Sequence, residues 1–172
     1  MAHDDGIYWY DPDPRAIFPL HNFHIPRSLK RTIKKGHFEM RINSDFNATI
    51  RACAAPNRDG AWIDDSIIAS YNKLHELGFA HSVETWQDGV MVGGLYGVSI
   101  RGLFAGESMF SHATDASKVA LVYLVQHMKQ QGLTLLDTQF MTDHLRRFGA
   151  IEIPREVYKK RLEEALEQDV RF

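Results

Sequence analysis

The sequence of 172 residues predicts an α+β fold, in which helices pack against one largely antiparallel sheet. Two segments, 64–77 and 115–131, begin with an aspartate and then place apolar residues at helical spacing. Two β-rich runs, 80–86 and 90–99, are joined through Asp-Gly, which is a strong hairpin signal. Because no repeat or linker-like stretch interrupts the chain, we expect a single domain over residues 1–172.

The first part of the chain combines turn signals with short elements. Prolines crowd residues 1–26, and each restricts its own backbone and that of its predecessor, so we expect an irregular N-terminal arm that packs on the body. A short helix over 28–35 should end at Gly36. The alternating run 37–42 predicts a strand, and 45–53 predicts a second helix.

Three glycines, Gly93, Gly94 and Gly97, interrupt the second run of the hairpin. Glycine weakens a strand, so we expect either a bulge or a ligand close to the backbone there. A third strand is predicted at 103–105, and Asp115 should then cap the long helix, which Gly132 closes. The order ends with a strand, a short helix and an amphipathic C-terminal helix, predicted at 133–137, 143–148 and 155–167.

The composition is that of an ordinary soluble globular protein, with 44% hydrophobic and 24% charged residues and a mean hydropathy of -0.31. Uncharged apolar stretches such as 119–126 are far shorter than the roughly 20 residues that span a bilayer. The first residues lack the basic flank and apolar run of a signal peptide. We therefore expect a cytoplasmic protein without a membrane segment.

Basic residues are concentrated in one part of the chain, although the formal net charge is -2. Residues 15–58 contain nine Lys and Arg but two acidic residues, with histidines and phenylalanines between them. This pattern suits contacts with a nucleic-acid backbone. A solvated basic helix over 28–35 explains the same charges, and charge alone does not separate the two interpretations.

Two polar side chains end the buried strand that precedes the short helix. Asp137 and Gln139 are two residues apart and should therefore project to the same face of that strand. The carboxylate can accept from the carboxamide NH₂ and so leave the Gln139 carbonyl free to accept a hydrogen bond from an attacking amine. A strand-end pair without a catalytic role is the alternative.

Glu107 lies in a segment, 106–111, that contains glycine and serine between apolar residues. In a pocket its carboxylate would bind an ammonium or guanidinium group, and otherwise it is a turn carboxylate. Five apolar residues from different predicted elements either surround one cavity or simply pack in the core: Leu95, Phe104, Met109, Leu124 and Leu136.

The sequence contains no motif for metal binding, for nucleotide binding or for a catalytic nucleophile. The nine histidines form no HExxH pattern, and the single cysteine, Cys53, lies in a helical run typical of a buried thiol. No nucleotide-binding motif and no GxSxG motif occurs. We expect neither a metal nor a cofactor.

Several longer motifs follow one another in a fixed order: WYDPDPR at 9–15, WI at 62–63, YNKLHELGFAHSVETW at 71–86, GGLYG at 93–97, GESMFS at 106–111 and LLDTQ at 135–139. In these motifs the chain resembles the bacterial leucyl/phenylalanyl-tRNA–protein transferase family. The resemblance implies an acetyltransferase-like (GNAT-type) core. It also implies transfer of Leu or Phe, with Met as a further candidate, from aminoacyl-tRNA to the N-terminal Arg or Lys of a protein, which creates an N-degron.

The resemblance also implies roles for individual residues. Asp137 would orient Gln139, whose carbonyl would help to deprotonate the attacking α-amine. Glu107 would engage the basic end of the acceptor, and the five apolar residues named above would form the pocket for an unbranched apolar side chain. Trp9 and Tyr10 would stack on the terminal adenosine of the tRNA, and the basic window would contact its acceptor stem.

The sequence departs from the family pattern in two respects. The region of several dozen residues that usually precedes the tryptophan motif is missing here apart from MAHDDGIY, and Tyr10 replaces a second tryptophan. Two alternative functions stay open. One is an aminoacyl-tRNA-dependent transferase with a non-protein acceptor, such as a cell-wall peptide amine, and the other is an inactive relative that binds tRNA.

Overall fold

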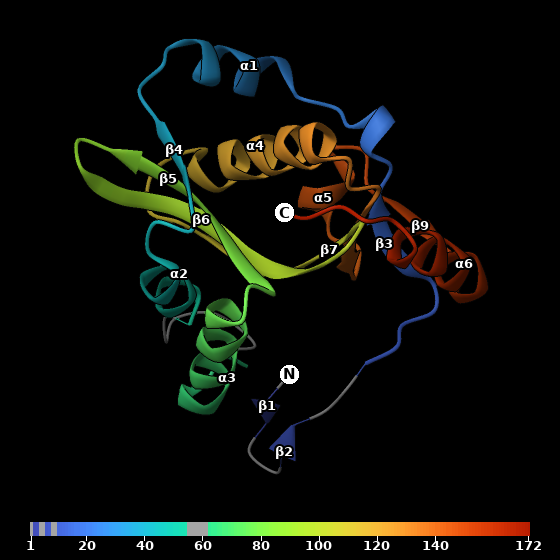
Figure 1. Ribbon diagram of the computed structural model, residues 1–172. Coiled ribbons are helices and arrows are strands. Elements are labelled where there is room, and N and C mark those ends of the chain that lie inside the picture. The colour runs from blue at the N-terminus through green and yellow to red at the C-terminus, as the bar shows by residue number, and fades with distance from the viewer. Residues whose placement is uncertain (1, 4–5, 8–9, 55–61) are drawn as a thin grey trace.

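The structure is a computed structural model that describes residues 2–3, 6–7, 10–54 and 62–172. Seven strands form one mixed sheet in the order β4-β5-β6-β7-β8-β3-β9, and β1 (Ala2–His3) pairs separately with β2 (Gly6–Ile7) (Figure 1). The seven strands are β3 (Arg15–Phe18), β4 (Glu39–Ile42), β5 (Ala80–Gln87), β6 (Val90–Ile100), β7 (Leu103–Ser111), β8 (Leu135–Gln139) and β9 (Ile151–Ile153). With helices on this sheet, the predicted α+β class is confirmed.

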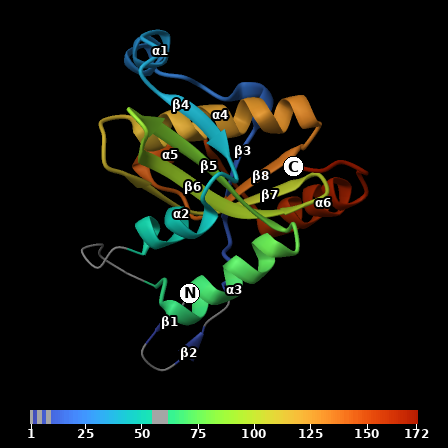
Figure 2. The ribbon, with the colours of Figure 1, turned by 60° about the vertical axis from the view of Figure 1, so that its left-hand side comes forward.

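Helices cover both faces of the sheet (Figure 2). One face carries α1 (Arg27–Lys34), α4 (Ala116–Gln131) and α5 (Asp143–Arg146). The opposite face carries α2 (Phe46–Cys53), α3 (Asp65–Glu76) and α6 (Arg155–Leu166). Side chains alternate along a strand, so Leu95 and Leu136 pack in the core with α4, whereas Tyr96 and Leu135 pack on the other face.

Side-chain caps mark the beginning of α2 and α3. The side chains of Asp45 and Asp64 accept hydrogen bonds from the backbone N–H groups three residues further on, which caps α2 and α3. Asp115 occupies the predicted N-cap position of α4, but its side chain does not cap the helix. Its backbone is left-handed, with a φ of 68°, and its carboxylate accepts from the side chains of Thr32 and Lys118 and not from a backbone N–H of the first turn.

The N-terminal arm is more ordered than the sequence predicts. Residues 15–18 form β3, which pairs with β8 on one side and β9 on the other. Pro14 and Pro19 flank this strand instead of interrupting it, so its own N–H groups remain available to the sheet. Strand β9 was not predicted, because three residues are too few to show alternation. A 3₁₀ turn, η1 (Leu20–Asn22), leads from β3 towards α1.

Strand β7 is also longer than predicted, and the sheet is open on the side where its pairing with β8 stops. It extends past the predicted 103–105 and pairs with β6 along most of its length. Its parallel pairing with β8 covers three positions, Leu103–Leu135, Phe104–Leu136 and Ala105–Asp137. Beyond Ala105 the two strands diverge, so one edge of β7 faces the gap between them.

The glycines of β6 are explained by packing and by a bulge. A Cβ at Gly93 would lie 2.5 Å from that of Ala116, where α4 begins, and one at Gly97 would collide with the Phe104 ring and the Ala105 carbonyl. The register between β6 and β7 shifts at Tyr96 and Gly97, where the extra residue belongs to β7. The bulge expected in β6 itself lies beside Gly93, where Val92 is the extra residue in the pairing with β5.

The last aromatic side chain of the sequence packs into the core beside two histidines. The ring centroid of Phe172 lies 4.6 Å from that of His81, 5.0 Å from that of Phe104 and 4.6 Å from that of His127. Burial lowers the pKa of His81 from 6.5 to about 4. His81 is therefore neutral in the folded protein at neutral pH.

We expect mild acid to weaken the fold through His81. Between pH 6.5 and about 4 the unfolded chain binds this proton and the folded chain does not, so the free energy of unfolding decreases as the pH falls through that range. One such group contributes a slope of at most about 1.4 kcal/mol per pH unit. Urea unfolding at pH 7 and pH 5 should show a smaller loss for His81→Gln than for the wild type, and equal losses would contradict this assignment.

Candidate active site

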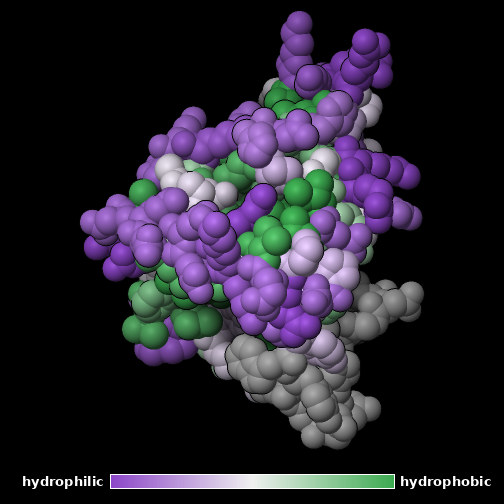
Figure 3. All heavy atoms as spheres, turned by 90° about the vertical axis from the view of Figure 1, so that its right-hand side faces the viewer, coloured by the Kyte–Doolittle hydropathy of each residue, from purple (hydrophilic) through white to green (hydrophobic). Residues whose placement is uncertain are grey.

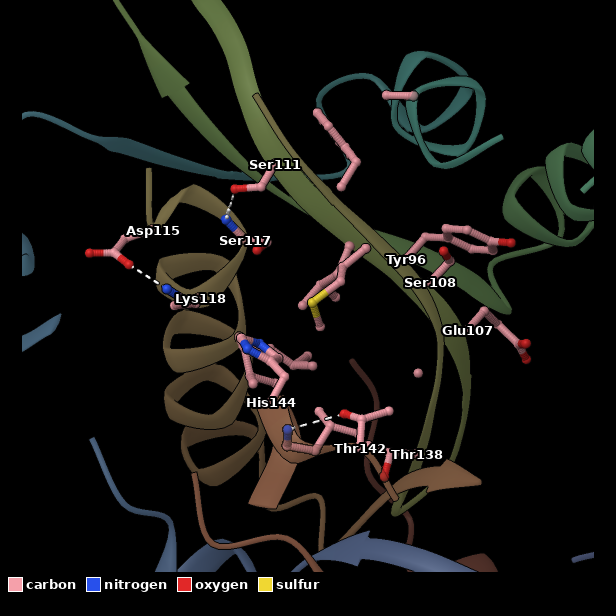
Figure 4. A pocket seen from close by; sticks show the side chains of 18 of the residues that line it. Tyr96, Glu107, Ser108, Ser111, Asp115, Ser117, Lys118, Thr138, Thr142 and His144 are labelled. Atoms are coloured by element: carbon pink, nitrogen blue, oxygen red, sulfur yellow. Dashed lines mark hydrogen bonds and ion pairs between the residues drawn. The ribbon is translucent and has the colours of Figure 1, made fainter. Parts of the chain in front are cut away.

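A cavity of about 1070 Å³ lies where β7 and β8 diverge. Because the gap passes through the sheet, residues from both faces line the cavity. Figure 4 shows Lys118 and His144 on the α4 side, and Tyr96, Ser108 and Glu107 on the other side, along β6 and β7. A ligand in this cavity would therefore be accessible from either face of the sheet.

The structure brings six of the predicted site residues together in the cavity lining: Leu95, Glu107, Met109, Leu124, Leu136 and Gln139. Phe104 lies outside the lining, because it is completely buried and packs against Phe172. Tyr10 also lies outside it, 49% exposed and edge-on to Phe140. Trp9 is not among the residues that the structure describes.

Glu107 occupies a bulge in β7 and not the turn considered from the sequence. Tyr96 pairs with Ser108 and Gly97 pairs with Gly106, so Glu107 is the extra residue between them, and a bulge redirects a side chain. The Glu107 carboxylate forms a hydrogen bond with the Tyr71 hydroxyl of α3. Burial raises the pKa of Glu107, and the nearby negative charge of Asp137 raises it further, whereas Tyr71 and Arg15 act in the opposite direction.

Asp137 is buried beneath the site, with 1% of its surface exposed. Arg15 of β3 donates to it from Nε, 3.2 Å from both carboxylate oxygens, and from Nη2, 2.8 Å from Oδ2. The Tyr158 hydroxyl of α6 donates to Oδ2 at 2.8 Å, and the Arg15 guanidinium lies 4.2 Å above the Tyr158 ring. Charge and hydrogen bonds together fix this carboxylate.

Gln139 forms a sharp turn at the end of β8. Its φ is 57°, in the left-handed region, and the Phe140 N–H donates to the Thr138 carbonyl at 2.6 Å across it. The β3–β8 register shifts at the same place, where Ile17 faces Asp137 and Ala16 faces Gln139. The turn therefore follows a bulge in the pairing of the two strands.

The turn changes the predicted relation between the two polar residues. A regular strand would place Asp137 and Gln139 on one face, with the Gln139 NH₂ donating to the carboxylate. In the structure, the Gln139 backbone N–H donates to Asp137 Oδ1 at 2.9 Å. Gln139 lines the cavity, whereas Asp137 packs with Arg15 and Tyr158 and is not part of that lining.

Sequence reasoning missed Arg15 and Tyr158 as site residues. Arg15 entered as one basic residue of the charged window and as the end of the WYDPDPR motif, without a role of its own, and Tyr158 lies in an amphipathic helical run that gives it no distinguishing signal. Their contacts with Asp137 span 122 and 21 positions of the chain, so no local pattern connects them. His144, which also lines the cavity, was equally unmarked.

The described residues contain neither a cluster of metal ligands nor a membrane-spanning helix. No group of three or more His, Cys, Asp or Glu side chains in the described part of the chain is arranged to hold a metal ion. Among the helices that the structure describes, none combines the length and apolar character required to cross a membrane.

Solved structures resemble this domain in their fold. L-PGS from Bacillus licheniformis superposes with a TM-score of 0.52 over 76% of this chain and 48% of its own, at 14% identity. An aminoglycoside acetyltransferase from an uncultured soil metagenomic sample gives a TM-score of 0.47 over 80% of this chain and 95% of its own, at 16% identity. The superposition on L-PGS shows that the mixed sheet and its helices form a fold that the two proteins share.

Sequence comparison places the chain in one family. The model of the leucyl/phenylalanyl-tRNA protein transferase family matches residues 17–163. The chain is 57% identical to the leucyl/phenylalanyl-tRNA–protein transferase of Herpetosiphon aurantiacus over 100% of this chain and 90% of the relative, and 50% identical to that of Paramagnetospirillum magneticum over 98% and 82%. The chain belongs to the leucyl/phenylalanyl-tRNA protein transferase family, which confirms the resemblance seen in its motifs.

Proposed function

We propose that the protein is an aminoacyltransferase that moves Leu or Phe from aminoacyl-tRNA to the N-terminal Arg or Lys of acceptor proteins and thereby creates an N-degron. One observation carries this proposal: the gap between β7 and β8 joins an apolar cavity to a half-buried carboxylate on the other side of the sheet, with Gln139 at its edge. Membership of the family supports it. Because charged tRNA is a cytoplasmic donor, a cytoplasmic location is part of the proposal.

The apolar part of the cavity suits the side chain of the transferred residue. Four apolar side chains converge there from the strands β6, β7 and β8 and from α4: Leu95, Met109, Leu136 and Leu124. Such a pocket distinguishes Leu or Phe from smaller residues by about 1 to 3 kcal/mol per methylene. We expect Val and Ile to be rejected by shape, and Met to be the closest competitor.

Glu107 suits the acceptor. Its carboxylate lies across the strands from α4 and is held by Tyr71. An N-terminal Arg or Lys side chain would form a charge-assisted hydrogen bond with it. The negative charge of Asp137 is already matched by Arg15, and that of Asp115, which also lines the cavity, by Lys118. Among the described residues of the lining, this leaves the Glu107 carboxylate for a cationic acceptor.

The reaction requires little beyond positioning. The acceptor α-amine attacks the carbonyl carbon of the aminoacyl ester, so that a C–N bond forms and the C–O bond to the ribose breaks. The amine loses a proton, and the ribose hydroxyl of the tRNA leaves with one. In our proposal the Gln139 carbonyl accepts a hydrogen bond from the amine and guides its attack; the ester is already activated, so orientation supplies most of the acceleration.

The basic helix α1 suits the RNA part of the donor. Its cationic side chains are exposed, whereas Leu29 anchors it in the core. Figure 3 shows hydrophilic side chains projecting at the top of the molecule, where Figure 1 places α1. The Thr32 hydroxyl donates to Asp115 at 3.1 Å, which ties the helix to the cavity rim. We propose that this surface contacts tRNA phosphates, and that Trp9 and Tyr10 stack on the terminal adenosine.

A transfer assay with charged tRNA tests the proposal. Labelled Leu, Phe, Met and Val would be supplied on tRNA to peptides that begin with Arg, Lys, Asp or Glu, and to a cell-wall peptide amine. We expect transfer of Leu and Phe to the Arg and Lys peptides, and none of Val. Transfer to the cell-wall amine instead would replace the proposed acceptor, and tRNA binding without any transfer would indicate an inactive relative.

A further inference from the structure

The Asp137 carboxylate has its hydrogen-bonding capacity filled by the protein itself. Arg15 donates to both oxygens, the Tyr158 hydroxyl donates to Oδ2, and the Gln139 backbone N–H donates to Oδ1. The residue is buried, and it does not belong to the cavity lining. An attacking amine would have to displace one of these donors in order to reach it.

The same contacts suggest that Asp137 acts on Gln139 through the backbone of that residue and not through its carboxamide. A left-handed backbone is unfavourable for a residue with a side chain, and it persists only where its surroundings hold it. At Gln139 that hold includes the hydrogen bond from its N–H to Asp137 Oδ1. The turn directs the Gln139 side chain to the cavity. Because the Asp137 carboxylate holds this turn, its orientation determines the position from which the Gln139 carboxamide extends.

Arg15 and Tyr158 determine that orientation. The two side chains approach Oδ2 from β3 and α6, with donor distances of 2.8 Å each, and they stack on one another. Burial, together with the charge of Asp137, raises the pKa of Tyr158, so its hydroxyl keeps its proton and donates. Three elements of the fold, β3, β8 and α6, thus meet at one carboxylate.

We propose that Arg15 and Tyr158 are positioning residues of the transfer reaction, which lock Asp137 so that it fixes the turn at Gln139. This inference rests on the proposed function, in which Gln139 guides the amine. It assigns Asp137 to the support of Gln139 and not to proton transfer.

Steady-state kinetics of Tyr158→Phe and Arg15→Lys provide the first test. Tyr158→Phe keeps the ring and removes one donor, so we expect kcat to fall about tenfold with KM for charged tRNA and for the Arg peptide within about twofold of the wild type. Arg15→Lys loses the two-nitrogen contact and should lower kcat about 30-fold or more. Tyr123→Phe, on α4, is the matched control and should retain full activity.

A double-mutant cycle separates positioning from general loss of structure. If Tyr158 acts through Gln139, then Tyr158→Phe should change kcat by less than about twofold when it is added to Gln139→Ala. If the two losses multiply, Tyr158 acts independently of Gln139 and the proposal is overturned. An unchanged kcat in both Tyr158→Phe and Arg15→Lys would overturn it equally.

Hydrogen exchange provides a measurement that does not depend on activity. The backbone N–H of Gln139 should exchange at least about tenfold faster in Tyr158→Phe than in the wild type, while the N–H of Leu136 in the same strand is unchanged. Unchanged exchange at Gln139 would refute the positioning role even if the wild type transferred no amino acid. An inactive wild type with the expected exchange would refute only the proposed function.

Discussion

Gln139→Ala is expected to lower kcat for Leu transfer about 100-fold and to leave the affinity for charged tRNA within about twofold of the wild type. The substitution removes the carbonyl that accepts from the amine, but it touches neither the apolar lining nor the basic helix. Single-turnover transfer and filter binding with Leu-tRNA would measure the two effects separately.

A matched control strengthens this experiment. Gln130→Ala changes an exposed glutamine near the end of α4 and should leave both quantities unchanged. If Gln139→Ala weakens tRNA binding as much as it slows turnover, Gln139 contributes to donor binding and its proposed role in guiding the amine is wrong.

Glu107→Gln is expected to raise KM for an Arg-initiated peptide about 10- to 100-fold, because a charge-assisted contact is lost, while KM for charged tRNA is unchanged. Burial raises the pKa of Glu107, so this carboxylate takes up its proton at a higher pH than an ordinary glutamate does. As the solution is acidified, the KM of the wild type for the peptide should therefore rise at a correspondingly higher pH. The variant should lack this pH dependence. Peptide kinetics from pH 8 to pH 5 would measure it.

The same raised pKa has a consequence for stability. Because the folded chain binds this proton more tightly than the unfolded chain, ionisation of Glu107 costs stability at pH 7, and that cost disappears below the pKa of the unfolded chain. Glu107→Gln should therefore have a larger free energy of unfolding than the wild type at pH 7. An exposed control, Glu164→Gln on α6, should match the wild type in both assays; a stability loss in Glu107→Gln would contradict the assigned burial cost.

The elements that the sequence predicted well carry their signals locally. Asp64 and Gly78 mark the two ends of α3, and the Asp88-Gly89 turn joins β5 to β6, so a few neighbouring residues suffice to define each. Strand β3 was missed because its four residues gain their structure from partners more than 100 positions away.

The site, too, combines features that were expected from the sequence with features that depend on distant residues. The resemblance to the family placed Glu107, Gln139 and the apolar residues, most of which the structure brings to one cavity. The left-handed turn at Gln139 depends on the bulge opposite β3, and Phe104 is covered by Phe172 from the far end of the sequence. Long-range contacts decide both, and a pattern of neighbouring residues contains no information about them.

The gap between β7 and β8 divides the sheet into a four-stranded and a three-stranded half, joined by three residue pairs. Residues of both halves line the cavity, so any molecule that fills it adds contacts across this short seam. A ligand that binds this cavity in the folded domain and does not bind the unfolded chain therefore stabilises the whole domain against thermal denaturation. An aminoacyl-adenosine fragment that enters the cavity should raise the melting temperature, which gives a direct way to rank donor side chains without following the chemical step.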